Sequence, residues 1–374
     1  MKLAFLFGSM SRGGAERVIA SLANTFCAAG DEISIITMDN NPSGYALDER
    51  VRHIRLNLAG KSKNKMEALI RNFRILRSLR KEIKRAGYDA GITFELRQAV
   101  LLQYAFPAGR KFKIITSERA NPNTRKLARF EKKQYDKMLP KVDGFIFQTK
   151  RVSLCYCERL REIGTVIHNG VFPEILPAEI PAFADRRHKD ICAVGRLAEQ
   201  KGYDILLRAF HLFGETHPEH RLHIYGEGAL RKALEEQIAA LGLGDRVTLH
   251  GSVANVMFQV FDMGMFVMAS RFEGMPNALM EAMACGVPCI STNCDFGPEE
   301  LVTDHENGIL VAVDDEKAIA AAMAEIADSP ELAQKLSENA RKIRETHSGD
   351  RIADRYHTYI SDVIHERNKE TGVQ

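Results

Sequence analysis

Short apolar runs of strand length alternate with amphipathic segments of helical length along almost the whole chain. Continuously apolar strands that are separated by helices are typical of parallel sheets covered on both faces. The expected strands are Leu3–Phe7, Ile33–Thr37, Ala90–Phe94, Phe112–Thr116, Gly144–Phe147, Thr165–His168, Ile191–Val194, Leu222–Tyr225, Val247–His250, Met265–Ala269 and Pro288–Ser291. The expected helices include Ala15–Ala29, Met66–Ala86, Tyr203–Glu215 and Leu230–Leu241. The pattern therefore predicts an α/β fold, whose ligands bind at the carboxyl ends of the strands.

The alternation is interrupted once, at residues 171–187, which contain three prolines and show no period. Such a stretch is typical of an interdomain linker. Because 374 residues exceed what one hydrophobic core usually supports, we expect two doubly wound Rossmann-like domains that face a cleft, residues 1–170 and 188–349. A helical pattern over Asp350–Lys369 can cap either domain, and we place residues 350–374 with the first.

The two halves of the chain differ in charge, although the formal net charge is only +3. Residues 1–170 hold 32 Lys and Arg against 16 Asp and Glu, and the remainder holds 20 against 33. This asymmetry predicts that the first domain meets an anionic partner, and an excess of solvated surface charge is the alternative. The content of 45% hydrophobic and 27% charged residues is typical of a soluble enzyme and excludes a disordered chain or a membrane bundle.

Several features bear on where the protein resides. No apolar run approaches the roughly 18 residues needed to cross a bilayer, and the run after Met1 is too short for a signal peptide. The seven cysteines form no CxxC pair and no zinc spacing, which favours reduced cytosolic thiols. We therefore expect a cytoplasmic protein.

Two turns between a strand and a helix carry residues suited to a phosphate group. Gly13 and Gly14 open the helix after the first strand, where the backbone can approach a ligand and free N–H groups can meet an anion. A tight turn without a ligand is equally consistent. In the second domain Arg196 and Lys201 follow a strand, and two cations there suit a diphosphate. A solvated loop would use the same residues.

The stretch from Ser270 to Pro288 carries two glutamates, Glu273 just before an expected helix and Glu281 within it. Pro276 suits the first turn of that helix, whose N-terminus can receive phosphates. Eight residues of helix rise about 12 Å, roughly the span from a nucleotide's ribose to the sugar beyond its diphosphate. For Glu281, simple surface exposure is the alternative.

The pair Glu273 and Glu281, with seven residues between them, resembles the signature of the retaining glycosyltransferases of family 4, which have the GT-B fold. Other blocks resemble the family in the same order along the chain: Gly13 to Arg17, His168 to Val171, Gly195 to Gly202, Gly274-Met275-Pro276-Asn277, Cys285 to Pro288, and Gly297 to Glu300. The resemblance is of the bacterial surface-polysaccharide or lipid-linked oligosaccharide type.

The resemblance implies roles for individual residues. Arg196 and Lys201 would bind the donor diphosphate, Glu281 the ribose hydroxyls, and Glu273 the transferred sugar. Gly13 and Gly14 would approach the phosphates from the first domain, and the donor site would also include Gly274, Met275, Pro276 and Asn277. Where several relatives have a histidine near the sugar, this chain has Glu118 and Arg119, which we assign to acceptor or sugar contact, with a buried ion pair as the alternative.

The implied activity is that of a retaining hexosyltransferase. It would move a hexose or N-acetylhexosamine from a nucleotide sugar, UDP preferred, to a lipid-linked or polysaccharide precursor at the cytoplasmic membrane face. No cofactor or metal is expected, because the chain has no Asp-x-Asp triplet. The alternatives are a GDP-sugar-dependent mannosyltransferase, a nucleotide-sugar epimerase or hydrolase of the same fold, and a sensor that binds the donor without turnover.

The basic half holds two clusters on helical patterns. Arg74, Arg77, Lys81 and Lys84 share one face within about 80° at 100° per residue, whereas Leu76, Leu79 and Ile83 share another. The second cluster is Arg125, Lys126, Arg129, Lys132, Lys133 and Lys137. The first pattern predicts contact with an anionic membrane or with the pyrophosphate of a lipid-linked acceptor. Packing of its apolar side, with the cations facing water, is the alternative. Nucleic acid is not expected, because no stacking aromatics interleave the cations.

Overall fold

The computed structural model describes residues 1–11, 13–60, 64–106, 111–119, 121–124 and 127–370. The chain divides into two compact units, Met1–Gly170 together with Gly349–Gln374, and Val171–Ser348. The proline-containing stretch after Gly170 belongs to the second unit, where it forms the 3₁₀ turns η3 (Pro173–Ile175) and η4 (Phe183–Asp185). The last helix, α15 (Gly349–Glu370), belongs to the first unit.

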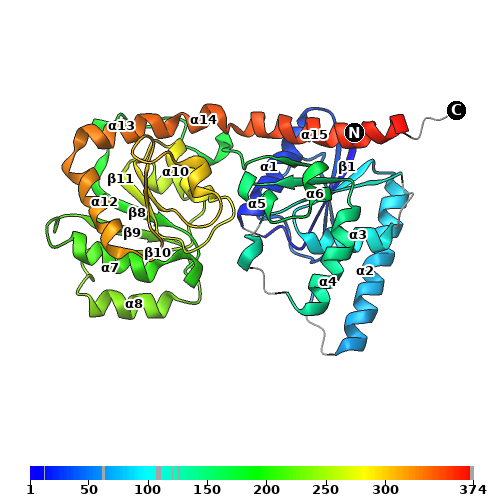
Figure 1. Cartoon of the computed structure of the whole chain (residues 1–374), viewed down its shortest axis with the longest axis horizontal. Helices are drawn as coiled ribbons and strands as arrows, with labels where there is room; N and C mark the ends of the chain where they lie inside the picture. The colour runs from blue at the N-terminus through cyan, green and yellow to red at the C-terminus, as the bar shows by residue number, and fades with distance from the viewer. Residues whose placement is uncertain (12, 61–63, 107–110, 120, 125–126, 371–374) are drawn as a thin grey trace. The chain divides into compact units, whose positions relative to one another are not determined.

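The first unit is built on a seven-stranded parallel sheet in the order β3-β2-β1-β4-β5-β6-β7 (Figure 1). Its strands are β1 (Lys2–Phe7), β2 (Glu32–Thr37), β3 (Arg52–Arg55), β4 (Ala90–Thr93), β5 (Lys113–Ser117), β6 (Gly144–Phe147) and β7 (Gly164–Val166). Its helices are α1 (Gly14–Ala28), α2 (Lys65–Ala86), α3 (Leu96–Ala105), α4 (Arg129–Met138), α5 (Lys150–Leu154), α6 (Glu158–Glu162) and α15, with the turns η1 (Pro122–Thr124) and η2 (Leu139–Lys141). Strand β3 was not predicted, because three of its four residues are Arg or His and its exposed edge position requires no apolar run.

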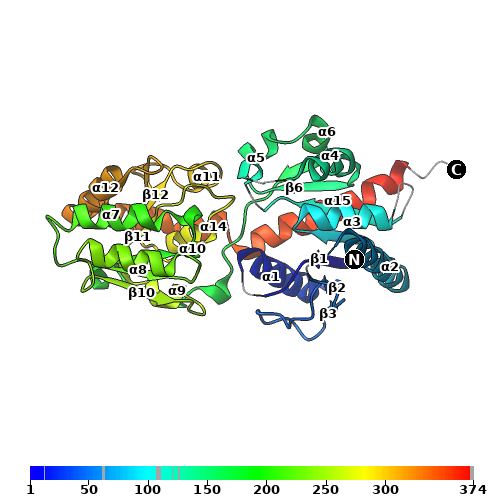
Figure 2. The same ribbon diagram turned by 90° about the horizontal axis from the view of Figure 1, so that it is seen from below.

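Helix α15 completes the core of the first unit. Its residues Ile352, Tyr356 and Ile360 are buried in one cluster with Phe5 of β1 and Phe26 of α1. Figure 2 shows α15 beside α1, in agreement with their contacts. Residues from the two ends of the chain therefore share one hydrophobic core.

The second unit has a six-stranded parallel sheet in the order β10-β9-β8-β11-β12-β13. Its strands are β8 (Arg187–Val194), β9 (Arg221–Tyr225), β10 (Val247–Gly251), β11 (Met263–Met268), β12 (Cys289–Thr292) and β13 (Ile309–Val311). Its helices are α7 (Tyr203–Phe213), α8 (Arg231–Ala240), α9 (Met257–Val260), α10 (Asn277–Ala284), α11 (Pro298–Leu301), α12 (Glu316–Asp328), α13 (Pro330–Arg341) and α14 (Ile343–Thr346), with the turn η5 (Glu199–Lys201). Strand β13 was missed, because three residues are too few to show a period.

Alternation along β11 divides the second unit into two cores. Met265 and Val267 point to one face, where they pack with residues of α7 and α12. Phe266 and Met268 point to the other face, where they pack with residues of α10. Successive side chains of a strand lie on opposite faces, so this sheet is covered on both sides. The predicted fold class, α/β with two doubly wound parallel sheets, is confirmed. Among the helices described here, none is long and apolar enough to span a bilayer.

Candidate active site

A tight loop joins β8 to α7 and carries the first two predicted donor ligands. The hydroxyl of Tyr203 donates to the carbonyl of Gly195 at 3.0 Å, which closes the loop on itself. Gly202 has φ +61, and a Cβ at this position would lie 2.0 Å from the carbonyl oxygen of Ala269. Glycine is therefore required at position 202, because a side chain would push the loop away from the end of β11.

The structure brings Lys201 and Glu273 into direct contact. The Nζ of Lys201 lies 2.6 Å from Oε1 of Glu273, and the two side chains are 17% and 8% exposed. The Nε2 of Gln200 donates to the carbonyl oxygen of Phe272 at 3.0 Å. Two segments that are distant in sequence thus meet at the carboxyl end of β8 and β11. A cation and a carboxylate are held there side by side.

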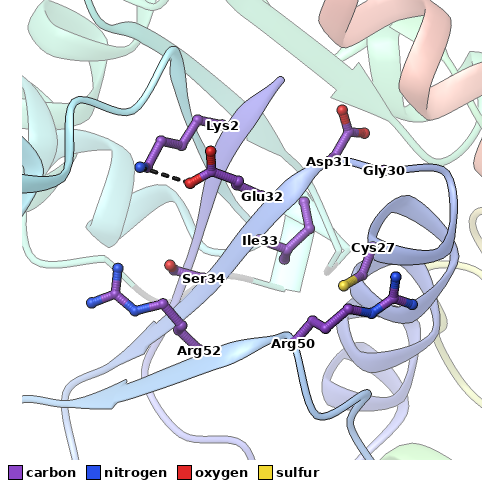
Figure 3. A pocket seen from close by; sticks show the side chains of 9 residues that line it. All are labelled: Lys2, Cys27, Gly30, Asp31, Glu32, Ile33, Ser34, Arg50 and Arg52. Carbon is purple, nitrogen blue, oxygen red and sulfur yellow. Dashed lines mark ion pairs between the residues drawn. The ribbon is translucent and has the colours of Figure 1, made fainter.

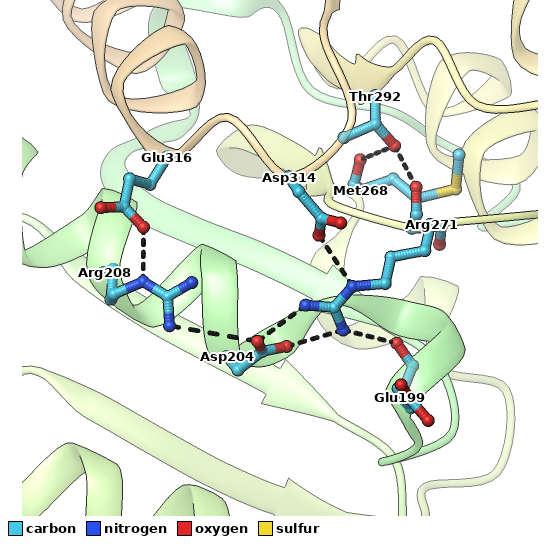
Figure 4. Close-up of polar contacts among 9 residues, drawn as sticks. Glu199, Asp204, Arg208, Met268, Arg271, Thr292, Asp314 and Glu316 are labelled. Atoms are coloured by element: carbon cyan, nitrogen blue, oxygen red, sulfur yellow. Dashed lines mark hydrogen bonds and ion pairs between the residues drawn. The ribbon is translucent and has the colours of Figure 1, made fainter.

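Arg271 also ties these two segments together (Figure 4). Its guanidinium binds both carboxylate oxygens of Asp204, at 3.0 and 2.8 Å, and its Nε donates to Asp314 at 2.7 Å. It also donates to the carbonyl oxygen of Glu199 at 2.8 Å. The hydrogen bonds to Asp204 raise the pKa of Arg271 above its ordinary value. Arg271 therefore holds the η5 turn that carries Lys201.

Asp204, Asp314 and Thr292 carry no signal in the sequence that predicts a place in the site. The Thr292 hydroxyl donates to the carbonyl oxygen of Ser270 at 2.5 Å and so fixes the start of the loop that leads to Glu273. None of the three lies in a local motif with the residues it supports. No local pattern could have found them, because their partners are 22 to 67 residues away along the chain.

Helix α10 places Glu281 inside the unit. Glu281 is buried, with 3% of the residue exposed, so the alternative of simple surface exposure is wrong. Pro276 is the N-cap of α10 and Asn277 its first residue. The predicted distance of about 12 Å between the two glutamates assumed eight residues of helix. This assumption is wrong, because the residues before Asn277 are not helical. The helix N-terminus still lies between the two carboxylates in sequence.

A second glycine sets the shape of this stretch. Gly297 has φ +94, and a Cβ there would lie 2.4 Å from the carbonyl oxygen of Gly274 and 2.6 Å from Cδ of Pro276. The loop before α11 therefore packs directly against the turn that begins α10. Met275 is 7% exposed and belongs to the core that surrounds α10. Packing on both sides fixes the turn from Gly274 to Asn277.

Arg196 differs from Lys201 in its surroundings. It is exposed, and its guanidinium makes no hydrogen bond or ion pair with the residues that the structure describes. A free guanidinium at the end of β8 can bind an anion without first breaking another interaction.

In the first unit, Gly13 is the N-cap of α1. The Tyr45 hydroxyl accepts from Gly13 N at 3.1 Å and donates to Gly13 O at 2.9 Å. Burial raises the pKa of Glu16 above its ordinary value, and burial together with the charge of Glu16 raises the pKa of Glu95. These two carboxyl groups follow β1 and β4 and were not predicted. Both groups therefore keep their protons to a higher pH than exposed carboxyl groups do.

Glu118 and Arg119 have structural partners within the first unit. Arg119 lies over the ring of Phe94, 4.2 Å from its centroid, and donates to the Tyr356 hydroxyl at 2.8 Å and to Asn169. Glu118 is 2% exposed and accepts from the Arg119 amide at 3.0 Å and from the Tyr156 hydroxyl. These contacts connect the end of β5 to Tyr356 of α15 and to Asn169, next to the point where the first segment of the unit ends at Gly170. They favour a structural role over acceptor contact.

The basic face of α2 is exposed at Arg74, Arg77, Lys81 and Lys84. On the opposite side Leu79 and Ile83 are buried, at 0% and 3% exposure, and Leu76 is half-buried. This apolar side packs within the unit while the cations face water. In the second cluster Arg129, Lys132, Lys133 and Lys137 are exposed on α4, and Arg125 and Lys126 lie outside the described residues.

A cavity of about 240 Å³ lies at the opposite end of the first sheet (Figure 3). Its charged groups are paired: Lys2 with Glu32 at 2.7 Å, Arg50 with Asp48 at 2.8 Å, and Arg52 with Glu82 at 3.6 Å. Lys2 and Glu32 are the first residues of their strands. Ligands of this fold bind at the carboxyl ends instead, so this cavity is not the active site. Among the described residues no group of three or more His, Cys, Asp or Glu could hold a metal ion.

Comparison with known proteins shows which protein families the two units resemble. Residues 12–175 match the family described as Glycosyltransferase Family 4, and residues 181–343 match Glycosyl transferases group 1. A Campylobacter jejuni protein, "GalNAc-alpha-(1->4)-GalNAc-alpha-(1->3)-diNAcBac-PP-undecaprenol alpha-1,4-N-acetyl-D-galactosaminyltransferase", is 27% identical over 355 residues, 91% of this chain and 93% of the relative. A second, "N-acetylgalactosamine-N,N'-diacetylbacillosaminyl-diphospho-undecaprenol 4-alpha-N-acetylgalactosaminyltransferase" from the same species, is 26% identical over 358 residues, 92% of this chain and 94% of the relative.

Solved structures share the fold. Sucrose-phosphate synthase from Thermosynechococcus elongatus superimposes with a TM-score of 0.82 at 20% identity, over 97% of this chain and 98% of that structure. Anabaena HepE in complex with UDP and glucose superimposes with a TM-score of 0.79 at 18% identity, over 96% and 99%. The two family models and the two doubly wound parallel sheets together identify a glycosyltransferase with the GT-B fold. Within that class, the chain belongs to the family 4-like hexosyltransferases.

Proposed function

We propose that this hexosyltransferase retains configuration and moves a hexose or N-acetylhexosamine from a nucleotide sugar, UDP preferred, to a lipid-linked or polysaccharide-precursor acceptor at the cytoplasmic membrane face. The observation that carries the donor side is the contact between Lys201 and Glu273, with exposed Arg196 on the same loop. The names of two relatives specify acceptors carried on undecaprenyl diphosphate. UDP is present in the HepE structure.

The leaving group in this reaction is a nucleoside diphosphate. Arg196 is the free cation that binds it, and Lys201 contributes one further positive charge from the turn held by Arg271. Backbone N–H groups at the start of α10 add donors aimed at the same anion. Such preorganised donors stabilise the negative charge that grows on the leaving phosphate. The chain's own cations are proposed to do this without a metal.

Glu273 and Glu281 are proposed to contact the two ends of the donor. A buried carboxylate is a strong acceptor for hydroxyl donors. Glu281 would bind the ribose hydroxyls, and Glu273, oriented by Lys201, would bind hydroxyls of the transferred sugar. Attack and departure are proposed to take place on the same face of the sugar, with the leaving phosphate accepting the proton of the acceptor hydroxyl.

The acceptor is proposed to meet the basic first unit. A lipid-linked glycan carries a diphosphate, and the exposed cations of α2, Arg74, Arg77, Lys81 and Lys84, provide positive charge for such a group. Gly13 and Gly14, at the start of α1, are proposed to approach the donor phosphates.

The test is a donor panel followed by an acceptor assay. UDP-, GDP- and ADP-sugars are compared by thermal shift, because a ligand of the folded state raises the apparent stability. The stabilising donor is then incubated with and without a synthetic diphosphate-linked glycan acceptor on a short lipid chain. Transfer only from a GDP-sugar would identify the mannosyltransferase alternative. Release of free sugar without use of any acceptor, or epimerised donor, would overturn the proposal. Donor binding without turnover would identify a sensor.

A further inference from the structure

Four large apolar side chains lie exposed on the first turns of α2. Met66 and Leu69 are each 67% exposed, Phe73 is 65% exposed and Ile70 is 49% exposed. Only four other large hydrophobic side chains among the described residues are exposed, and they belong to other elements. Scattered single residues of this kind are normal on a protein surface, whereas a group within two helical turns marks an interaction site.

The four residues form one stripe, which we call the α2 stripe. Their spacing of i, i+3, i+4 and i+7 places them on one side of a helix. The packing side of α2 is a different one, because Ile75, Leu79 and Ile83 are buried at 3%, 0% and 3% exposure. The stripe is therefore not required to hold α2 on its own unit. Figure 1 shows this end of α2 extending beyond α3.

The basic residues of α2 continue the same side of the helix. At 100° per residue, Arg77 and Lys84 fall within about 30° of the centre of the stripe, and Lys81 and Arg74 lie about 70° and 90° from it. All four are exposed, and their charged groups form no hydrogen bond or ion pair with other residues of the described ranges. The exposed side of α2 thus carries apolar groups near its N-terminus and unpaired cations closer to its C-terminus.

We infer that this side of α2 is a docking surface for an anionic lipid bilayer. The α2 stripe enters the boundary between head groups and acyl chains, and the adjoining cations contact anionic head groups. A helix with apolar groups beside cations binds at such an interface through buried apolar area and electrostatic attraction together. A second copy of this chain would not suit the surface as well, because the same cations would face one another across a symmetric contact. The inference deepens the proposed function, since it places the enzyme at the surface that holds a lipid-linked acceptor.

The chain contains no tryptophan, so a single one reports on its own surroundings. The variant Phe73→Trp places it in the α2 stripe, and Leu154→Trp is the matched control at another exposed apolar position, 63% exposed at the end of α5. Each is titrated with vesicles of phosphatidylcholine alone and with 30% phosphatidylglycerol. We expect a blue shift for Phe73→Trp with anionic vesicles only, reversed by moderate salt, and no shift for Leu154→Trp. Equal shifts at both positions, or none at Phe73→Trp at low salt, would overturn the inference.

A combined variant, Met66→Ser, Leu69→Ser, Ile70→Ser and Phe73→Ser, separates docking from catalysis. We expect at least a tenfold loss of vesicle co-sedimentation, with unchanged thermal unfolding and unchanged transfer to a short-chain soluble acceptor. Transfer to an acceptor embedded in vesicles should fall with docking. Loss of both transfers together, in a folded variant, would count against the docking role.

Absence of transfer in every protein, with intact vesicle binding, would contradict the proposed function and leave the docking surface standing. A dimer in light scattering that the variant abolishes, without vesicle binding of the parent, would identify a second copy as the occupant and overturn the inference.

Discussion

Arg271 holds Asp204 through both carboxylate oxygens and at the same time donates to the backbone carbonyl of Glu199, two residues before Lys201. One side chain thereby fixes the start of α7 and the η5 turn against the loop that carries Glu273. The position of Lys201 depends on this arrangement, because the turn is a single 3₁₀ unit with few bonds of its own. Arg271 is a positioning residue for the active site.

We expect Arg271→Ala to lower kcat at least tenfold while the KM for the donor changes less, because Lys201 loses its fixed place relative to the leaving phosphate. Arg271→Lys should not restore activity, since lysine cannot bind two oxygens of Asp204 and a carbonyl at once. Steady-state kinetics on both variants test this. Arg208→Ala is the control, because Arg208 pairs with Glu316 in the same network without contacting the turn; an equal loss in that variant would refute the assignment.

Arg196→Ala and Lys201→Ala should each lower turnover by about 10²–10³, the typical effect of removing one preorganised donor from developing charge. Their stabilities should differ. Loss of Lys201 leaves Glu273 buried without its cation, which costs about 3 kcal/mol or more, whereas Arg196 is exposed. Thermal unfolding beside single-turnover assays checks both. Near-normal turnover in either variant contradicts the proposed roles.

Glu281→Gln keeps the volume of the side chain but removes its charge. If Glu281 binds the ribose hydroxyls, the Kd for UDP should rise by about tenfold or more, the effect of losing a charge-assisted hydrogen bond. Calorimetric titration with UDP and with UMP measures this, and both ligands should weaken alike because they share the ribose. Unchanged binding of both would place the ribose elsewhere.

Arg119→Met should lower the stability of the first unit while the KM for the acceptor stays unchanged. The variant loses the contact with Phe94 and the hydrogen bonds to Tyr356 and Asn169, and we expect a cost of about 1–3 kcal/mol. Arg97→Met, at an exposed position, is the control. A large rise in acceptor KM without loss of stability would restore the acceptor role.

The stability of the protein should depend on Glu95 through pH. Burial and the charge of Glu16 raise the pKa of Glu95 above its ordinary value of 4.5. At a pH between the unfolded and folded pKa values, the folded state holds a proton on Glu95 that the unfolded state has lost. The contribution of Glu95 to stability is therefore fully present below about pH 4.5 and is lost as the pH rises through the folded pKa. Glu95→Gln should flatten the unfolding temperature between pH 4.5 and 7 relative to the parent chain. A profile parallel to that of the parent would contradict this.

Local sequence patterns predicted the elements that are long and apolar. Strand β6 begins and ends at the predicted residues, α2 begins one residue before its predicted start, and α15 extends one residue beyond the prediction at each end. The charged edge strand β3 was missed, because an edge needs no continuous apolar run. On α2 the sequence pattern predicted one apolar face, Leu76, Leu79 and Ile83, of which Leu79 and Ile83 are buried. The exposed apolar residues Met66, Leu69, Ile70 and Phe73 were not predicted, because the sequence pattern does not show which apolar residues of a helix remain in solvent.

By itself the sequence determined the class of fold and the presence of two sheets, because periodicity is a local property. The glycine and glutamate positions indicated the family only through their resemblance to its known motifs. Only the tertiary structure decided that Lys201 pairs with Glu273, that Arg271 fixes the η5 turn carrying Lys201, and that Glu281 is buried. Each of these depends on which strand ends lie side by side. Strand order follows from the packing of the whole chain, so residues 72 positions apart meet without any signal in the segments that carry them.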